Sequence, residues 1–169
     1  RADAAALIRE LFFNLRVTWR QGRYVDVLLR LFRLEEAILR HVVERDWSVP
    51  TESVDWKADP RFVAFVEGDP GLKSHFDVPD AGGRLLDYRR EPNVPILSHL
   101  LAGLAQRADA ANADEYRAVV EAVGRLEKLT RLRNKSIGAH GFRGVSEAAI
   151  REAYGRDRDL LADLEELLL

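Results

Sequence analysis

Apolar residues recur along most of the chain at the three- and four-residue spacing of an amphipathic helix, and the alternation typical of a strand is hard to find. The spacing predicts a first helix over about Ala4–Trp19, a break at Gln21-Gly22, and a second helix over about Tyr24–Val43. The second helix is apolar nearly all round, through Val25, Leu28, Leu29, Leu31, Phe32, Leu34, Ile38 and Leu39. Such a helix lies in the middle of a bundle or is sealed by a partner chain, and the pattern leaves both alternatives open. The sequence predicts an all-α fold.

The middle of the chain, from about 46 to 95, is less regular. Residues 50–83 hold four of the six prolines and four of the eleven glycines, which allows only short helices such as Asp59–Val66. We interpret this stretch as an irregular connector between the N-terminal helix pair and the C-terminal helices.

The C-terminal half returns to helical spacing. A helix is predicted from Val94 to about Ala105, and a long helix follows in which Asn112 and Glu115 form a capping-box pattern. Apolar residues form a stripe along the long helix, at Tyr116, Val119, Val123, Leu126 and Leu129. Gly138 and Gly141 mark its expected end. Ser146 is expected to cap a short helix, EAAIREAY, and RDLLADLEELLL closes the chain.

The length and composition fit one folded unit. A chain of 169 residues is of ordinary size for a single domain, so we expect one helical domain over 1–169. The chain has no methionine, and we therefore expect it to be a piece of a longer protein. With no apolar run of membrane-spanning length, no secretory pattern and no cysteine, we expect an intracellular, cytoplasmic protein.

One segment concentrates positive charge. Between Arg125 and Arg143 there are six lysines and arginines against one acid, Glu127, in a chain whose formal charge is -2. A local excess of this kind is the electrostatic footprint of a phosphate-binding surface, although a charge run is more often only a solvated helix face. A second basic stretch near the N-terminus could supply the other side of a groove, through Arg16, Arg20, Arg23, Arg30 and Arg33.

Arg133 occupies an unusual position within the basic segment. On a helical wheel it falls within about 20° of Leu126, on the face of the apolar stripe. Its stem either snorkels past the core, or the face leaves the core at that point and lines a cleft or a dimer interface. The wheel alone does not decide between these interpretations.

The same segment holds the groups that cleavage of RNA without a metal requires. Histidine can take or give a proton near neutral pH, and a guanidinium can stabilise the charge that develops on a phosphorane. His140 and Arg133 supply one of each, and polar Asn134 follows the arginine directly.

The segment RNKSIGAH resembles the motif of the HEPN ribonuclease superfamily, an arginine and a histidine separated by four to six residues with a polar residue after the arginine. The helix GRYVDVLLRLFRLEEAIL is similar to the one that precedes the motif in the HEPN half of type III CRISPR accessory ribonucleases. The resemblance implies an α-helical bundle that cleaves single-stranded RNA without a metal or cofactor. Arg133, Asn134 and His140 would be catalytic, and RNA contacts would come from Arg125, Lys128, Arg131, Lys135 and Arg143.

The resemblance also implies partners. Two copies of the motif would face each other in a homodimer with a composite active site. A continuous helix would separate Arg133 from His140 by about 10 Å along its axis, which suits groups drawn from two chains. In the CRISPR enzymes a separate CARF domain senses cyclic oligoadenylate, and nothing in this sequence looks like that strand-rich domain. We therefore expect any such sensor to lie outside this chain.

Other polar and aromatic residues are interpreted as structural. His41, His75 and His99 show no ligand spacing, and no His, Asp or Glu pattern predicts a metal site. Glu35-Glu36 is most simply a solvated helix face. The three tryptophans are more often core or rim than platforms for base stacking, and they are Trp19, Trp47 and Trp56.

The sequence therefore favours an endoribonuclease that acts as the effector of a CRISPR or related antiviral defence system. The alternatives are a catalytically silent HEPN-like module that binds RNA or a partner protein, and a HEPN toxin of a toxin–antitoxin system.

Overall fold

A computed structural model describes residues 4–80, 82–107, 110–134 and 144–168. The described residues form eight helices and one two-stranded hairpin, so the all-α prediction is confirmed. The elements are α1 (Ala4–Arg20), α2 (Tyr24–Trp47), β1 (Ser53–Val54), β2 (Lys57–Ala58), α3 (Pro60–Gly68), α4 (Pro70–Phe76), α5 (Val94–Ala105), α6 (Ala110–Asn134), α7 (Glu147–Tyr154) and α8 (Leu160–Leu168). None of the described helices is long and apolar enough to cross a membrane.

The chain divides into two compact units. The first comprises Arg1–Ala37 and Glu121–Leu169, and the second comprises Ile38–Val120. Helices α2 and α6 each cross the division in sequence, and the units are described separately below.

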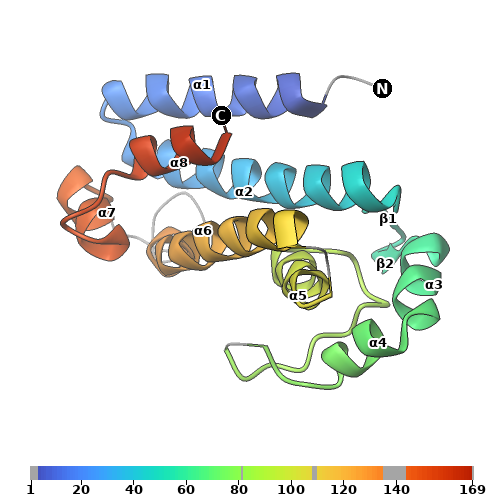
Figure 1. Ribbon diagram of the computed structural model, residues 1–169. Helices are drawn as coiled ribbons and strands as arrows, with labels where there is room; N and C mark the ends of the chain where they lie inside the picture. Colours follow the sequence, from blue (N-terminus) through green and yellow to red (C-terminus); the bar gives the residue numbers. More distant parts are fainter. Residues whose placement is uncertain (1–3, 81, 108–109, 135–143, 169) are drawn as a thin grey trace. The chain divides into compact units, whose positions relative to one another are not determined.

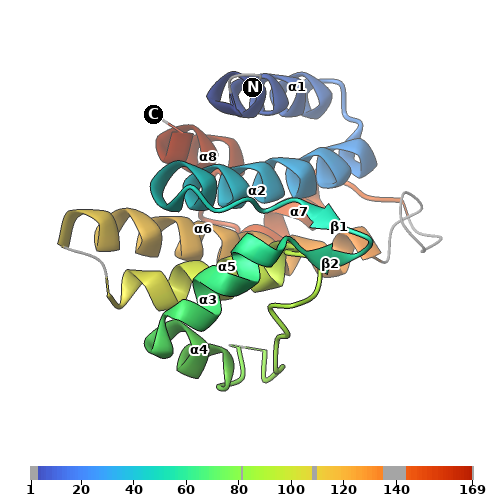
Figure 2. The same cartoon turned by 90° about the vertical axis from the view of Figure 1, so that its right-hand side faces the viewer.

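The first unit is built around the beginning of α2. In Figures 1 and 2, α1 and α8 lie on one side of this part of α2, and the end of α6 lies on the other. Arg16 of α1 donates to Glu165 of α8 at 3.0 Å, and the Tyr24 hydroxyl donates to Glu147 of α7 at 2.8 Å. Each of these helices contributes buried side chains to the unit, including Leu15, Val27, Leu28, Leu31, Leu34, Leu126, Leu129, Ile150 and Leu164.

Helix α2 accounts for much of the core. Its apolar residues are mostly buried within the chain itself, although Leu29 stays 37% exposed. The helix continues four residues beyond the predicted end at Val43, to Trp47. A partner chain is therefore not needed to cover most of its apolar surface.

The second unit contains the stretch that we expected to be an irregular connector. The expected helix over Asp59–Val66 is confirmed as α3, but the hairpin and α4 were not predicted. Two Asp-Pro pairs explain the helices, because the side chains of Asp59 and Asp69 cap α3 and α4 and a proline occupies the first turn of each. The stretch carries its own buried side chains, Phe62, Val66, Leu72, Phe76 and Tyr88. It is a packed part of this unit rather than a loose link.

Three helix ends test the sequence signals directly. Helix α5 has the predicted bounds, and Ser146 caps α7 by accepting a hydrogen bond from the Ala149 amide at 3.2 Å. Helix α6 begins at Ala110, so Asn112 lies in its first turn and is not the cap that the sequence suggested. Alanines at 110 and 111 favour a helix, which extends it past the predicted start. Its predicted end at Gly138 and Gly141 lies outside the described residues.

Candidate functional site

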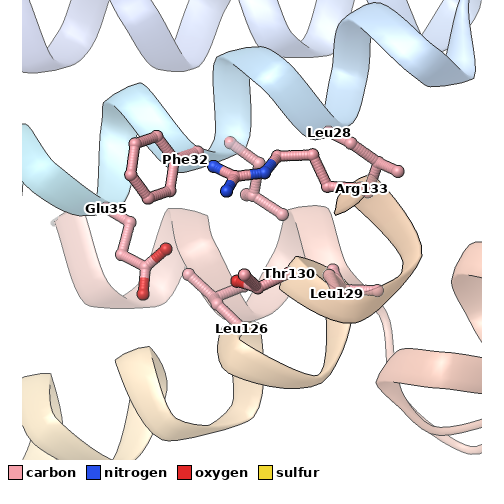
Figure 3. Close-up of a pocket in the computed structure, with 8 residues that line it drawn as sticks. Leu28, Phe32, Glu35, Leu126, Leu129, Thr130 and Arg133 are labelled. Carbon is pink, nitrogen blue, oxygen red and sulfur yellow. The ribbon is translucent and has the colours of Figure 1, made fainter. Parts of the chain in front are cut away.

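Arg133 lies in the last turn of α6, and two neighbours fix its guanidinium. Nε and Nη2 both donate to the Asn134 side-chain oxygen, at 3.2 and 2.9 Å. The guanidinium carbon lies 4.2 Å from the centre of the Phe32 ring on α2, a distance at which the ring attracts a cation. Figure 3 shows the Arg133 side chain crossing towards Phe32. The arginine and asparagine of the sequence motif are therefore in direct contact, and an aromatic ring that the sequence did not single out orients them.

A pocket of about 190 Å³, counting the open solvent at its mouth, separates α2 from α6 at this point. Its lining is Leu28, Leu31, Phe32 and Glu35 from α2, and Leu126, Leu129, Thr130 and Arg133 from α6 (Figure 3). All eight residues belong to the first unit. The space that a water-sized group could occupy is only about that of one water molecule. The pocket holds polar groups at the edge of a core and is too small to receive a nucleotide base.

Glu35 is the most unusual group in the pocket. Its side chain is buried, with only 3% of the residue exposed, so the interpretation of Glu35 as part of a solvated face is wrong. Burial raises the pKa of its carboxyl from about 4.5 to about 8, with a smaller rise from Glu127 and an opposing effect of the positive charge on Arg133. At neutral pH the carboxyl is therefore mostly protonated. Helical spacing could have revealed that Glu35 is buried. It lies seven residues after Leu28 and four after Leu31, on the same face of α2 as these buried leucines.

Glu36 differs from its neighbour. It is partly exposed and accepts from Arg33 at 3.1 Å, one turn earlier in the same helix. Of the two neighbouring glutamates, only Glu36 faces solvent as the sequence led us to expect.

The remaining basic residues of α6 do not gather around Arg133. Arg131 is exposed, and two residues of helix place it about 200° round the axis from Arg133. Lys128 is exposed too, about 140° away by the same geometry. Arg125 donates to Glu121 at 2.7 Å, and its Nε is buried. Lys135, His140 and Arg143 lie outside the described residues.

The second basic stretch is largely engaged in ion pairs within the first unit. Arg16 pairs with Glu165, Arg23 pairs with Asp26, and Arg33 pairs with Glu36. These carboxylates offset much of the positive charge that the sequence placed on this side of a groove.

Two histidines that sequence spacing did not connect form a stacked pair in the second unit. The rings of His75 on α4 and His99 on α5 lie 4.1 Å apart, 25° from parallel. Each Nε2 lies close to the backbone oxygen of the other residue, at 3.0 and 3.1 Å. Since a carbonyl oxygen only accepts, each Nε2 carries the proton. Among the described residues no group of three or more His, Cys, Asp or Glu side chains is arranged to hold a metal ion.

Comparison with known proteins adds no relative. No family model, no curated protein and no solved structure matches the chain.

Proposed function

We propose that this chain is a metal-independent endoribonuclease of the HEPN kind, which cleaves single-stranded RNA by attack of the ribose 2′-hydroxyl. The observation that carries the proposal is the setting of Arg133. Its guanidinium is held by Asn134 and by the Phe32 ring at the end of a long helix, and His140 follows seven residues later in the sequence. A cation fixed before substrate binds costs little reorganisation when charge develops on a phosphate.

The proposed reaction joins the 2′-oxygen to the adjacent phosphorus and breaks the bond from phosphorus to the 5′-oxygen. The proton of the 2′-hydroxyl leaves to a base, and the departing 5′-oxygen receives one. His140 would act as base or acid in these transfers. Arg133 would stabilise the phosphorane, and Asn134 would keep the guanidinium in position. The products would be a 2′,3′-cyclic phosphate and a 5′-hydroxyl.

The proposal includes a homodimer in which two motifs form one composite site, and a role as the effector of a CRISPR or related antiviral defence system. Both follow from the resemblance to HEPN ribonucleases. A sedimentation experiment that finds only monomer at tens of micromolar would contradict the composite site.

One observation favours a second function, a catalytically silent module that binds RNA or a partner protein. Arg133 packs over Phe32 and bonds to Asn134, as a purely structural arginine would. Such a module could retain His140 without using it. A toxin of a toxin–antitoxin system would share the active-site chemistry and differ in its partner.

Cleavage of a fluorogenic single-stranded RNA in EDTA tests the proposal. We expect the wild type to cleave, and His140→Ala and Arg133→Ala to lose about 10²-fold or more in kcat. Arg131→Ala is the matched control, because it removes the same charge from the same turn of α6 on another side of the helix. We expect it to change kcat by less than about threefold, since a remote charge affects mainly substrate binding. Equal losses for Arg131→Ala and Arg133→Ala, or full activity in His140→Ala, would overturn the proposed mechanism.

A further inference from the structure

The hairpin of the second unit presents a tryptophan to solvent. Strands β1 and β2 form a hairpin (Figure 2). Asp55 and Trp56 are the two residues that join them. Trp56 is 82% exposed, more than any other large apolar residue described. A tryptophan so exposed contributes little to the core.

The backbone at the hairpin tip is unfavourable for the residues it carries. Asp55 and Trp56 have φ angles of 51° and 63°. Positive φ at both central residues is the pattern of a type I′ turn, which normally uses Asn-Gly or Asp-Gly because glycine pays no steric cost there. A bulky residue with positive φ is an outlier, and such strain concentrates at functional sites. The positive φ angles at the turn cost conformational free energy, and the exposed Trp56 ring makes too few contacts to offset that cost.

Two basic residues lie beside Trp56 along the backbone, because Lys57 follows it in the hairpin and Arg90 bridges to Lys57. Lys57 forms an antiparallel bridge with Arg90, flanked by hydrogen bonds from the Glu91 amide to the Trp56 oxygen and from the Ala58 amide to the Arg89 oxygen, both at 3.1 Å. This is the non-hydrogen-bonded type of pair, in which opposed side chains share one face and approach closely.

Like charges in that arrangement repel each other, unless an anion lies between them. Arg90 is paired with Asp87, whose oxygen is 3.7 Å from Nε. With Arg90 81% and Asp87 49% exposed at their side chains, the contact is weak and easily exchanged for a phosphate.

We infer that Trp56, Lys57 and Arg90 form a contact for single-stranded RNA, with a base stacked on the indole and a phosphate held between the two cations. An exposed ring beside paired cations is the combination by which proteins bind single strands without reading their sequence. The choice of RNA as ligand rests on the proposed function. The contact lies in the second unit, whereas the Arg133 pocket lies in the first. It revises the interpretation of Trp56 as core or rim.

The test measures binding of a fluorescein-labelled 2′-O-methyl oligouridine by anisotropy, because that strand has no 2′-hydroxyl to attack and is bound without being cut. Trp56→Gly is the informative variant, since glycine suits the φ of 63° and removes the ring without straining the turn. We expect affinity to fall about fivefold or more, as for the loss of one stacked base. The melting temperature should stay the same or rise.

The charged side chains have their own readout. Each phosphate contact to a single strand contributes about 0.7 to the slope of log affinity against log salt concentration. Lys57→Ala and Arg90→Ala should each lower the slope by about that amount. Asp55→Asn keeps a residue that tolerates positive φ and removes a neighbouring negative charge, so it should tighten binding.

Leu85→Ala is the matched control, because Leu85 is another exposed apolar residue of the second unit, at 70%, and its loss should not change affinity. Unchanged affinity in Trp56→Gly would overturn the inference and point to a protein partner for the ring. A wild type that binds no oligonucleotide would overturn it as well. Ring-dependent binding by a wild type that cuts no RNA would support this contact while the proposed function fails. Cleavage with a KM that does not change in Trp56→Gly would support the proposed function and overturn this contact.

Discussion

The guanidinium of Arg133 lies over the Phe32 ring, with 4.2 Å between the guanidinium carbon and the ring centre. This contact links the end of α6 to α2 within the first unit. It also distinguishes between the two interpretations of the helical wheel. Arg133 lines a small pocket between α2 and α6, as expected if this face leaves the core and lines a cleft, and a ring and an amide oxygen hold its head at the rim. An arginine in that setting has one preferred orientation.

Replacing Phe32 should release Arg133. A cation over an aromatic face is worth about 0.5–2 kcal/mol, so Phe32→Leu should reduce RNA cleavage by about two- to thirtyfold if the orientation of Arg133 limits the rate. Leu29→Ala is the matched control, because Leu29 is a partly exposed apolar residue one turn earlier on the same helix. A second readout is independent of activity. The ring-current shift of the Arg133 Nε proton in NMR spectra should vanish in Phe32→Leu and persist in Leu29→Ala.

Arg133→Lys tests the geometry rather than the charge. A lysine keeps the positive charge but has no planar fork, so it does not reproduce the two bonds to the Asn134 oxygen or the stacking on Phe32. We expect kcat to fall about tenfold or more with KM changed little. A variant with normal kcat would show that charge alone suffices, and that Asn134 and Phe32 do not position the group.

Glu35 should make the first unit less stable at alkaline pH. Burial raises the pKa of its carboxyl to about 8 in the folded chain, from an ordinary value near 4.5 in the unfolded chain. Between these values the folded state binds more protons, so the free energy of unfolding decreases as pH rises through this range. The total loss is on the order of a few kcal/mol. Arg133, whose charge opposes the shift, and Glu127, whose charge adds to it, are the groups that act on Glu35.

Glu35→Gln isolates this effect, because glutamine keeps the size and polarity of a protonated carboxyl and does not ionise. Urea unfolding at pH 5 should give similar stabilities for wild type and variant, and at pH 8 the variant should be the more stable. Glu36→Gln, at the partly exposed neighbouring position, should follow the wild type at both pH values. Parallel pH profiles for wild type and Glu35→Gln would show that the carboxyl titrates normally.

Local signals predicted most of the helices, but α4 and the hairpin were missed. Ser146 marks the start of α7 through a bond to an amide three residues later, and the structure places this cap where the sequence did. The hairpin was missed because its turn carries Asp-Trp, not the Asn-Gly or Asp-Gly that signals a two-residue loop.

The candidate site was predicted in the same uneven way. Arg133 and Asn134 were singled out by the motif, but the bonds between their side chains were not predicted, because adjacent side chains on a helix do not normally face each other. Phe32 and Glu35 meet Arg133 only because α2 and α6 pack together, about a hundred residues apart in the chain. The sequence shows a glutamate at position 35 whether that face of the helix is solvated or buried. The burial that raises its pKa depends on the fold and not on the residue type.

The stacked histidines should make the second unit sensitive to acid. Burial lowers the pKa of His75, and the neighbouring His99 lowers it further, although its bond to the His99 oxygen acts in the opposite direction. A histidine whose pKa is lowered by folding binds a proton less readily in the folded chain than in the unfolded chain. The resulting loss of stability is absent above the unfolded-state pKa near 6.5 and grows as pH falls below it. Relative to a variant that lacks His75, we expect the wild type to lose stability in urea between pH 7 and pH 5.

Comparing His75→Gln with His41→Gln separates this pair from the other histidines. His75→Gln should be less stable than the wild type at pH 7, where it loses the ring stacking, but its stability should change less towards pH 5. His41→Gln leaves the pair intact, so the loss of stability that the pair causes at acid pH should persist in it. If both variants show the same profile as the wild type, the acid sensitivity originates elsewhere.

Two helical glycines should respond oppositely to the same substitution. A Cβ added to Gly103 of α5 would lie 2.8 Å from His75 Cδ2 and 3.2 Å from Leu72 Cδ2, both on α4, so the helices would have to separate. Gly103→Ala should therefore destabilise the chain by about 1–3 kcal/mol, the usual cost of overpacking. A Cβ at Gly124 of α6 meets nothing within 4 Å, so Gly124→Ala should stabilise by about 0.5–1 kcal/mol through helix propensity alone. Urea unfolding of the two variants at pH 7 measures both effects. Stabilisation by Gly103→Ala would mean that α4 does not pack against α5 at this glycine.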